Sequence, residues 1–232
     1  MTQSVCPFDI PAAVFNASYL ATVVSVQDPD NLSRVRVALH NFAGLADQDA
    51  AVWARVAAPF AGDGRGAFML PDVEDEVLVS FVNGDPRYPI VVGGLWNGAA
   101  GAPETLGGSG DRVDRWTIVG KAGTRIAIIE ESGSQAKIIL ETPGGVVCEI
   151  SDQGGGLTEF TVAGTTVTFD TQGVTVQTSG NVDVQASKVS VSAGMVTVDA
   201  AMSKFSGVVK CDVLQATTVI SSTYTPGAGN VW

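Results

Sequence analysis

Between residues 158 and 213, hydrophobic residues come in pairs two positions apart, and the pairs recur every seven or eight residues. The six pairs are Phe160/Val162, Val167/Phe169, Val174/Val176, Val182/Val184, Val189/Val191 and Val196/Val198. On an α-helix, residues i and i+2 point roughly 200° apart, whereas on a strand both face the same way. A coiled coil would need apolar spacings of three and four. The pattern therefore predicts short β-strands.

Each repeating unit contains only a few extended residues before a Gly, Ser or Asn corner, with glycines at 164, 173, 180, 194 and 207. A unit this small cannot close a core of its own and must stack on its neighbours. Two geometries fit: three chains that each supply one face per layer, or one chain that coils with about 21–24 residues per turn. Continuous ladder hydrogen bonding along a closed prism is made most easily by several copies, which favours the intertwined trimer.

Upstream of this region, short segments with strand character alternate with Gly, Asp and Pro turns. The expected strands cover residues 19–27, 33–40, 51–58, 66–70, 76–82 and 89–95. Five or six short strands in so few residues predict a small closed barrel. The tetrapeptides Asp-Pro-Asp-Asn at 28–31 and Asn-Gly-Asp-Pro at 83–86 predict tight reversals.

These signals divide the chain into five parts. Residues 1–18 contain Pro7 and Pro11 and predict an irregular arm, which either docks on another surface or packs on its own domain. A glycine-rich segment then predicts a flexible or extended linker between barrel and prism. The expected parts are the arm 1–18, the barrel 19–96, the linker 97–112, a β-helix spike 113–215 and a C-terminal tip 216–232.

Within the expected spike, a strand at residues 113–119 and a hairpin of residues 125–129 with 137–140 begin the β region. Three consecutive glycines, 154–156, are expected to mark a break before the regular repeats.

Composition supports an all-β chain and narrows the possible partners. Hydrophobic residues make up 45% and charged residues 16%, and the net charge of −11 argues against a nucleic-acid partner. The three cysteines are too far apart for a metal knuckle or a redox pair, and their odd number suggests assembly in a reducing cytoplasm. We expect them to be small buried hydrophobes. No apolar run is long enough to span a bilayer.

The residues needed for catalysis are missing. A single histidine, His40, supports neither a Ser/His/Asp arrangement nor a usual zinc ligand set. The glycine-rich run 62–66 lacks the Lys-Ser/Thr of a phosphate loop and predicts a turn. The acidic run 72–76 predicts a solvated turn, because paired catalytic carboxylates must face each other across a cleft. We therefore predict no catalytic, cofactor-binding or metal-binding residue, and no enzyme.

Two consecutive motifs carry a family resemblance. Residues 70–81, LPDVEDEVLVSF, and 83–93, NGDPRYPIVVG, resemble the OB-fold domain of the gpV/VgrG-type central spikes of contractile injection systems. Further matches, in chain order, are Asp28-Pro29, RVRV at 34–37, WARV at 53–56, KAGTRI at 121–126, TPGG at 142–145 and the tail 222–230, which is similar to tails of phage-baseplate spikes.

The resemblance implies an all-β protein, with an N-terminal OB-fold barrel followed by an intertwined trimeric triple-stranded β-helix needle. It implies a homotrimer at the centre of a virion tail baseplate, assembled in the bacterial host cytoplasm, which pierces the target cell envelope when a sheath contracts. Hub and wedge proteins of the baseplate are the implied partners. Some family members carry a hydrolase domain near the linker, for which this chain has no room.

The resemblance does not decide how the C-terminal tip is built. Some family members bind iron there through a His-x-His element, and this sequence has none. The tip is then either metal-free or covered by a separate PAAR-like protein. Trp232 would either blunt the open end of the needle or seat that protein.

Three alternatives remain. The first is a spike of a non-phage contractile injection system. The second is an OB-fold ligand-binding module attached to a β-solenoid, although a strand-binding groove would need basic and aromatic residues that the barrel lacks. The third is a β-solenoid acyltransferase, which the seven-to-eight spacing and the position of His40 disfavour.

Overall fold

The computed structural model describes residues 17–42, 51–131 and 136–223. The chain divides into two compact units, 1–181 and 182–232. The described residues form strands and three short 3-10 turns: η2 (His40–Phe42), η3 (Val82–Gly84) and η4 (Gln153–Gly155). This confirms the all-β class. The expected arm, apart from residues 17–18, and the tip beyond residue 223 lie outside the described residues.

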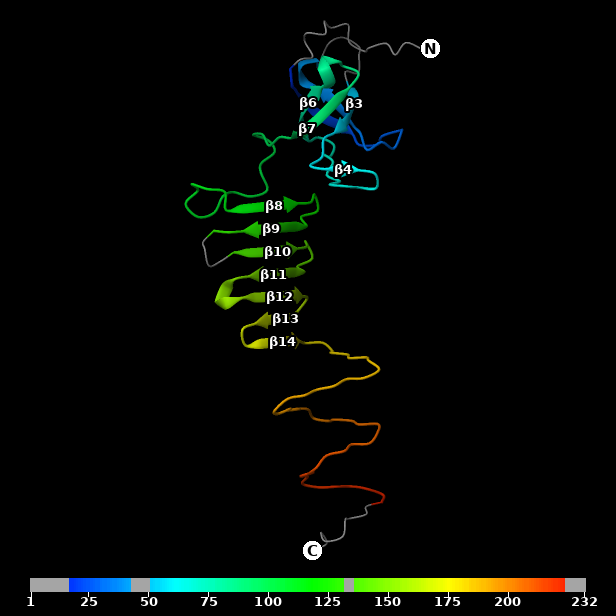
Figure 1. Ribbon diagram of the computed structural model, residues 1–232, viewed down its shortest axis with the longest axis vertical. Helices are drawn as coiled ribbons and strands as arrows, with labels where there is room; N and C mark the ends of the chain where they lie inside the picture. The colour runs from blue at the N-terminus through cyan, green and yellow to red at the C-terminus, as the bar shows by residue number, and fades with distance from the viewer. Residues whose placement is uncertain (1–16, 43–50, 132–135, 224–232) are drawn as a thin grey trace. The chain divides into compact units, whose positions relative to one another are not determined.

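Five strands form a closed barrel in the order β1-β2-β3-β7-β6 (Figure 1). The strands are β1 (Tyr19–Ser25), β2 (Val35–Leu39), β3 (Ala51–Val56), β6 (Glu76–Phe81) and β7 (Pro89–Gly94). All neighbouring pairs are antiparallel except β3 and β7, whose parallel pairing closes the barrel. Alternate residues point inward, as in β2, where Val35, Val37 and Leu39 are buried and the residues between them are not. The predicted barrel is confirmed.

The predicted strand at residues 66–70 is wrong. The chain forms a two-residue hairpin instead, β4 (Ala61–Gly62) with β5 (Arg65–Gly66), and residues 67–70 pair with no strand. Because β3 and β7 close the barrel, no free edge remains for a sixth strand. The run 62–66 is a turn, as expected, with Gly64 at φ 64°.

The loop between β1 and β2 is organised by Asp28. Its carboxylate accepts hydrogen bonds from the backbone N–H groups of Asp30, Leu32 and Arg34, at 3.1, 2.9 and 3.1 Å. The Arg34 guanidinium adds two more, from Nε at 3.0 Å and Nη2 at 2.6 Å. The hydrogen bonds from Arg34 are the main reason why the pKa of Asp28 lies far below its ordinary value.

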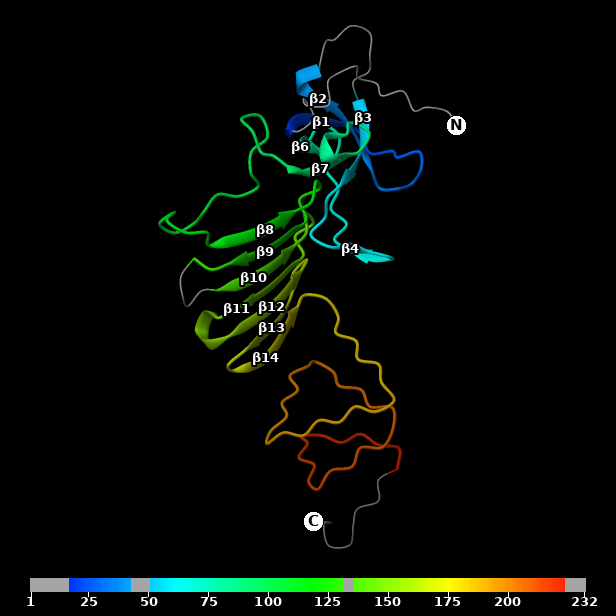
Figure 2. The ribbon, with the colours of Figure 1, turned by 45° about the horizontal axis from the view of Figure 1, so that its top comes forward.

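The second part of the chain is a seven-stranded antiparallel sheet in which the strands follow one another in sequence order (Figures 1 and 2). The strands are β8 (Arg115–Val119), β9 (Arg125–Ile129), β10 (Lys137–Glu141), β11 (Val147–Ser151), β12 (Leu157–Val162), β13 (Thr165–Asp170) and β14 (Gly173–Thr178). The predicted hairpin of residues 125–129 with 137–140 is confirmed as β9 with β10.

The sheet corrects the expectation that chains are braided from the first hydrophobic pair of the repeat onward. The first three hydrophobic pairs of the repeat lie in β12, β13 and β14, which hydrogen-bond to each other within one chain. The cause is the turn between β12 and β13, a two-residue loop in which Ala163 and Gly164 have φ of 43° and 85°. Two positive φ values make a tight hairpin, so the next strand must return along the previous one. The glycines at 154–156 do not interrupt the sheet either, because β11 pairs with β12 across them.

Residues 97–112 contain no strand but are anchored to the sheet through Glu104. The Glu104 side chain is 16% exposed; it accepts a hydrogen bond from Arg125 Nε at 2.5 Å and pairs with Arg115 at 3.3 Å. Burial raises the pKa of Glu104, but hydrogen bonds from Arg125 and other neighbours outweigh burial, so the pKa lies below its ordinary value. The backbone N–H of Gly107 also donates to Asp114 at 3.1 Å. This segment is therefore held at two points.

Residues 182–223 form no strand, and each of them is exposed. In Figure 1 this segment is a plain trace that swings from side to side without a strand arrow. Among the described residues, 182–220 make no backbone hydrogen bond with one another or with the rest of the chain.

Candidate functional site

One face of the seven-stranded sheet is apolar across all of its strands. Cross-strand partners lie on the same face, so the strand register defines a continuous row. That row runs through Ile118, Ile126, Leu140, Cys148, Phe160, Val167 and Val176, one residue from each strand. A second row runs parallel to it through Trp116, Ile128, Ile138, Ile150, Thr158, Phe169 and Val174. We call these two rows the apolar face.

Nothing within the described chain covers the apolar face. Its large side chains stay at least 42% exposed: Trp116, Ile118, Ile126, Ile128, Ile138, Leu140, Ile150, Phe160, Phe169, Val174 and Val176. An antiparallel sheet normally packs its apolar side on a core and leaves only the polar side in water. A contiguous apolar patch of this kind marks an interaction surface.

The opposite face of the sheet is mixed: charged and hydroxyl side chains stand among the apolar residues Ala127, Ile129, Ile139, Val147 and Leu157. Lys137 pairs with Glu149 at 3.8 Å and Arg125 with Glu141 at 4.0 Å. The Thr168 hydroxyl donates to Glu159 at 3.4 Å. Ala127 and Ile129 are buried on this face, whereas the large side chains of the apolar face are exposed. The apolar face is therefore the one that lacks a covering layer in the described chain.

The sequence prediction missed most of the apolar face. Its earlier members form the same pairs two positions apart, such as Trp116/Ile118, Ile126/Ile128 and Ile138/Leu140. They were not recognised because wider loops separate them than the seven-to-eight spacing of the later pairs.

The remaining hydrophobic pairs, from Val182 to Val198, lie in the second unit. Their side chains are 63–72% exposed, and the backbone around them has no partner among the described residues. A coil made by one chain would hydrogen-bond each turn to the next. Among the described residues, 182–220 show no such pairing.

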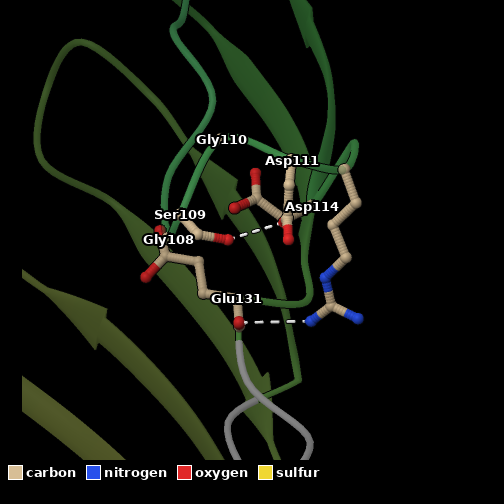
Figure 3. A pocket seen from close by; sticks show the side chains of 7 residues that line it. Gly108, Ser109, Gly110, Asp111, Asp114 and Glu131 are labelled. Atoms are coloured by element: carbon tan, nitrogen blue, oxygen red, sulfur yellow. Dashed lines mark hydrogen bonds between the residues drawn. The ribbon is translucent and has the colours of Figure 1, made fainter.

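A polar hollow of about 330 Å³ lies between the linker and the end of β9 (Figure 3). Figure 3 shows Asp111, Asp114 and Glu131 around it, and the Ser109 hydroxyl donates to Asp111 at 2.6 Å. Arg112 donates to the backbone oxygens of Glu130 and Glu131, each at 3.3 Å. Across the described part of the chain, no three His, Cys, Asp or Glu side chains are grouped to hold a metal ion.

The histidine and the cysteines considered in the sequence analysis lie in different parts of the fold. The His40 Nε2 lies 2.8 Å from the Thr22 hydroxyl oxygen on the barrel. Cys148 is half-buried and Cys211 is exposed, so the expectation of buried cysteines is wrong for Cys211; Cys6 lies outside the described residues. Both described cysteines lie in segments that a single chain leaves uncovered. In the described ranges, no helix has the length and apolar character to cross a membrane.

Comparison with known proteins assigns the barrel. Residues 19–96 match the family described as the type VI secretion system/phage-baseplate injector OB domain. Three relatives show the range of similarity. The type VI secretion system spike protein VgrG4b of Pseudomonas aeruginosa is 41% identical over 78 residues, which is 33% of this chain and 10% of the relative.

The spike protein VgrG3 of Vibrio cholerae is 37% identical over 92 residues, covering 38% of this chain and 9% of the relative. The actin cross-linking toxin VgrG1 of Vibrio cholerae is 35% identical over 60 residues, 26% of this chain and 6% of the toxin. The chain thus spans about a tenth of the length of these relatives. Its closed five-stranded barrel coincides with the matched residues. Residues 19–96 therefore form a type VI secretion system/phage-baseplate injector OB domain, and through this domain the chain is similar to gpV/VgrG-type spikes of contractile injection systems.

Proposed function

We propose that this chain is the central spike of a contractile injection system, a homotrimeric needle driven through a target cell envelope when a sheath contracts. The observation that carries the proposal is the state of residues 182–220. They combine a backbone that has no hydrogen-bonding partner among the described residues with regularly spaced, exposed valines. Such a segment gains stability only when other chains supply both the hydrogen bonds and the apolar contacts.

Three copies satisfy both needs. Around a three-fold axis, the valine pairs of each chain face inward, and the backbone of each chain pairs with its two neighbours, so no sheet edge is left open. The apolar face of the sheet, residues 115–178, adds a second surface for the same copies to bury. Fully burying one Ile, Leu or Phe contributes roughly 1.5–3 kcal/mol.

The role is mechanical and needs no catalytic group. A closed shaft of hydrogen-bonded strands resists bending and shear. We propose the domain order of a barrel at 19–96, a connecting segment at 97–112, a shaft at 113–215 and a tip at 216–232. Within this shaft, one chain builds the sheet of residues 115–178, and braiding between chains begins after it. Hub and wedge proteins of a baseplate would surround the barrel, and a PAAR-like protein is the candidate cap at the C-terminus.

Two machines fit. The first is the baseplate of a virion tail, assembled in the cytoplasm of a bacterial host. The second is a non-phage contractile injection system. The names of the relatives, type VI secretion system spike proteins, favour the second, whereas the family description covers both.

Immunogold electron microscopy tests the role. Contractile particles from the bacterium that encodes the chain are labelled with an antibody raised against residues 182–223, beside particles from a strain lacking the chain. The proposal expects gold at one end of the particles, and heads on the labelled particles would assign them to a phage. Contractile particles that assemble normally without the chain would refute the role.

A further inference from the structure

Two barrel arginines, Arg55 and Arg65, line the same groove. The groove has a volume of about 690 Å³ and lies beside the β4–β5 hairpin. Its apolar lining includes Phe60, Phe68 and Met69, and no acidic residue lines it. In a chain with a net charge of −11, a groove whose only charges are positive is unusual.

These arginines differ from the others of the barrel. Arg34 pairs with Asp28 at 2.6 Å and Arg87 with Asp85 at 2.6 Å. Within the described part of the chain, Arg55 and Arg65 make no hydrogen bond or ion pair. Beside them, Phe68 is 77% exposed. Free guanidinium groups next to exposed aromatic rings fit a ligand that carries both a carboxylate and an apolar group.

The turn before β6 has this chemistry. Val73 is 39% exposed, and Glu74 follows it at φ 79°, held there because its backbone N–H donates to the Val23 oxygen at 2.9 Å. The neighbouring carboxylates are occupied: Asp72 pairs with Lys121, and Asp75 accepts the Asp72 N–H at 2.8 Å. The Glu74 carboxylate makes no hydrogen bond or ion pair among the described residues, although its charge helps to raise the pKa of Lys121, and Val73 and Glu74 do not line the groove of their own chain.

We propose that the groove of each barrel receives the Val73–Glu74 turn of a neighbouring copy. Glu74 pairs with Arg55 or Arg65, while Val73 packs on Phe68 and Met69. Groove and turn are different surfaces, so the contact is heterologous, and around a three-fold axis it closes into a ring. The inference rests on the proposed trimer. It adds a contact that fixes the orientation of each barrel relative to its neighbour.

Photo-crosslinking of the full chain tests the contact. Val73 is replaced by p-benzoylphenylalanine, and the mass in solution is measured before irradiation. The expected result is a trimer that yields covalently linked dimers on a denaturing gel, with the crosslink mapped to residues 60–70. The double variant Arg55→Glu/Arg65→Glu should lower the crosslinked fraction at least about fivefold, because like charges then oppose each other. Adding Glu74→Arg should restore it.

The control is Arg87→Glu, which reverses a charge outside the groove and should leave the crosslinked fraction unchanged. A trimer without crosslinks to residues 60–70 would overturn the groove contact and leave the proposed spike intact. A monomer would overturn both.

Discussion

At the residue scale, the carboxylate of Asp28 connects three backbone N–H groups with one guanidinium. The substitution Asp28→Asn removes the charge but keeps the shape. We expect a lower Tm for the variant at pH 7, because the charge-assisted hydrogen bonds from Arg34 are weakened. The check is thermal unfolding of the wild type and the variant across a pH series.

The pH dependence follows from the depressed pKa of Asp28. A group with a lowered folded pKa contributes stability above its ordinary value of 3.8, and this contribution is lost as the pH falls toward the folded pKa. The Tm difference between wild type and Asp28→Asn should therefore be constant near neutrality and narrow below about pH 4. A difference that does not change with pH would show that the charge of Asp28 is not what holds the loop.

The second residue-scale prediction concerns Gly164 in the turn between β12 and β13. Its φ of 85° disfavours any residue with a Cβ, although a Cβ there would meet only the Ser179 hydroxyl, at 3.8 Å. Gly164→Ala should cost about 1–2 kcal/mol through backbone strain. Gly144→Ala is the matched control, since Gly144 has ordinary backbone angles and the nearest atom lies 4.0 Å away. Urea unfolding of the two variants should separate them; equal losses would refute the strain argument.

At the element scale, neighbouring residues of β14 distinguish the two faces of the sheet. Val176 belongs to the apolar face, and Thr175 lies on the opposite face. Val176→Asp would place three unpaired carboxylates inside the proposed trimer, at a penalty of several kcal/mol per ion, so we expect the trimer to be lost. Thr175→Asp should leave it intact. Light scattering on both variants checks the prediction.

The outcome that would contradict this assignment is a trimer in both variants. The apolar face would then be covered by something other than copies of the chain.

Strand positions were largely predictable from the sequence, whereas strand partners were not. The alternation of apolar and polar residues in 33–40 and 76–82 correctly predicted β2 and β6, because one face of each strand lines the barrel core. Residues 66–70 were mispredicted, since hydrophobicity alone does not reveal that the barrel is already closed. A pair such as Phe160/Val162 identifies a strand but fits pairing within a chain and between chains equally well.

Partner choice is decided by the turns. Ala163-Gly164 forces a reversal, and Asp170 assists the next one by accepting the N–H groups of Gln172 and Gly173 at 2.8 and 3.0 Å. After Thr178 the hydrophobic pairs continue, yet no strand follows in the described residues. The apolar face was missed for a related reason: its rows form only when residues from seven strands are brought into register.

At the scale of the whole molecule, the hydrogen bonding of the backbone changes near residue 180. Up to Thr178 each strand pairs with its own neighbours, and from residue 182 to residue 220 the described backbone has no partner in the chain. In the proposed trimer, the first part folds within one chain and other copies complete the second. This division was not expected from the hydrophobic repeat, which runs through both parts without interruption.

The central claim is that the chain is completed by two further copies of itself. Multi-angle light scattering of the purified full-length protein tests it directly. A mass near three times 23.8 kDa, about 71 kDa, is the predicted result. A stable, folded species of 23.8 kDa would contradict the account.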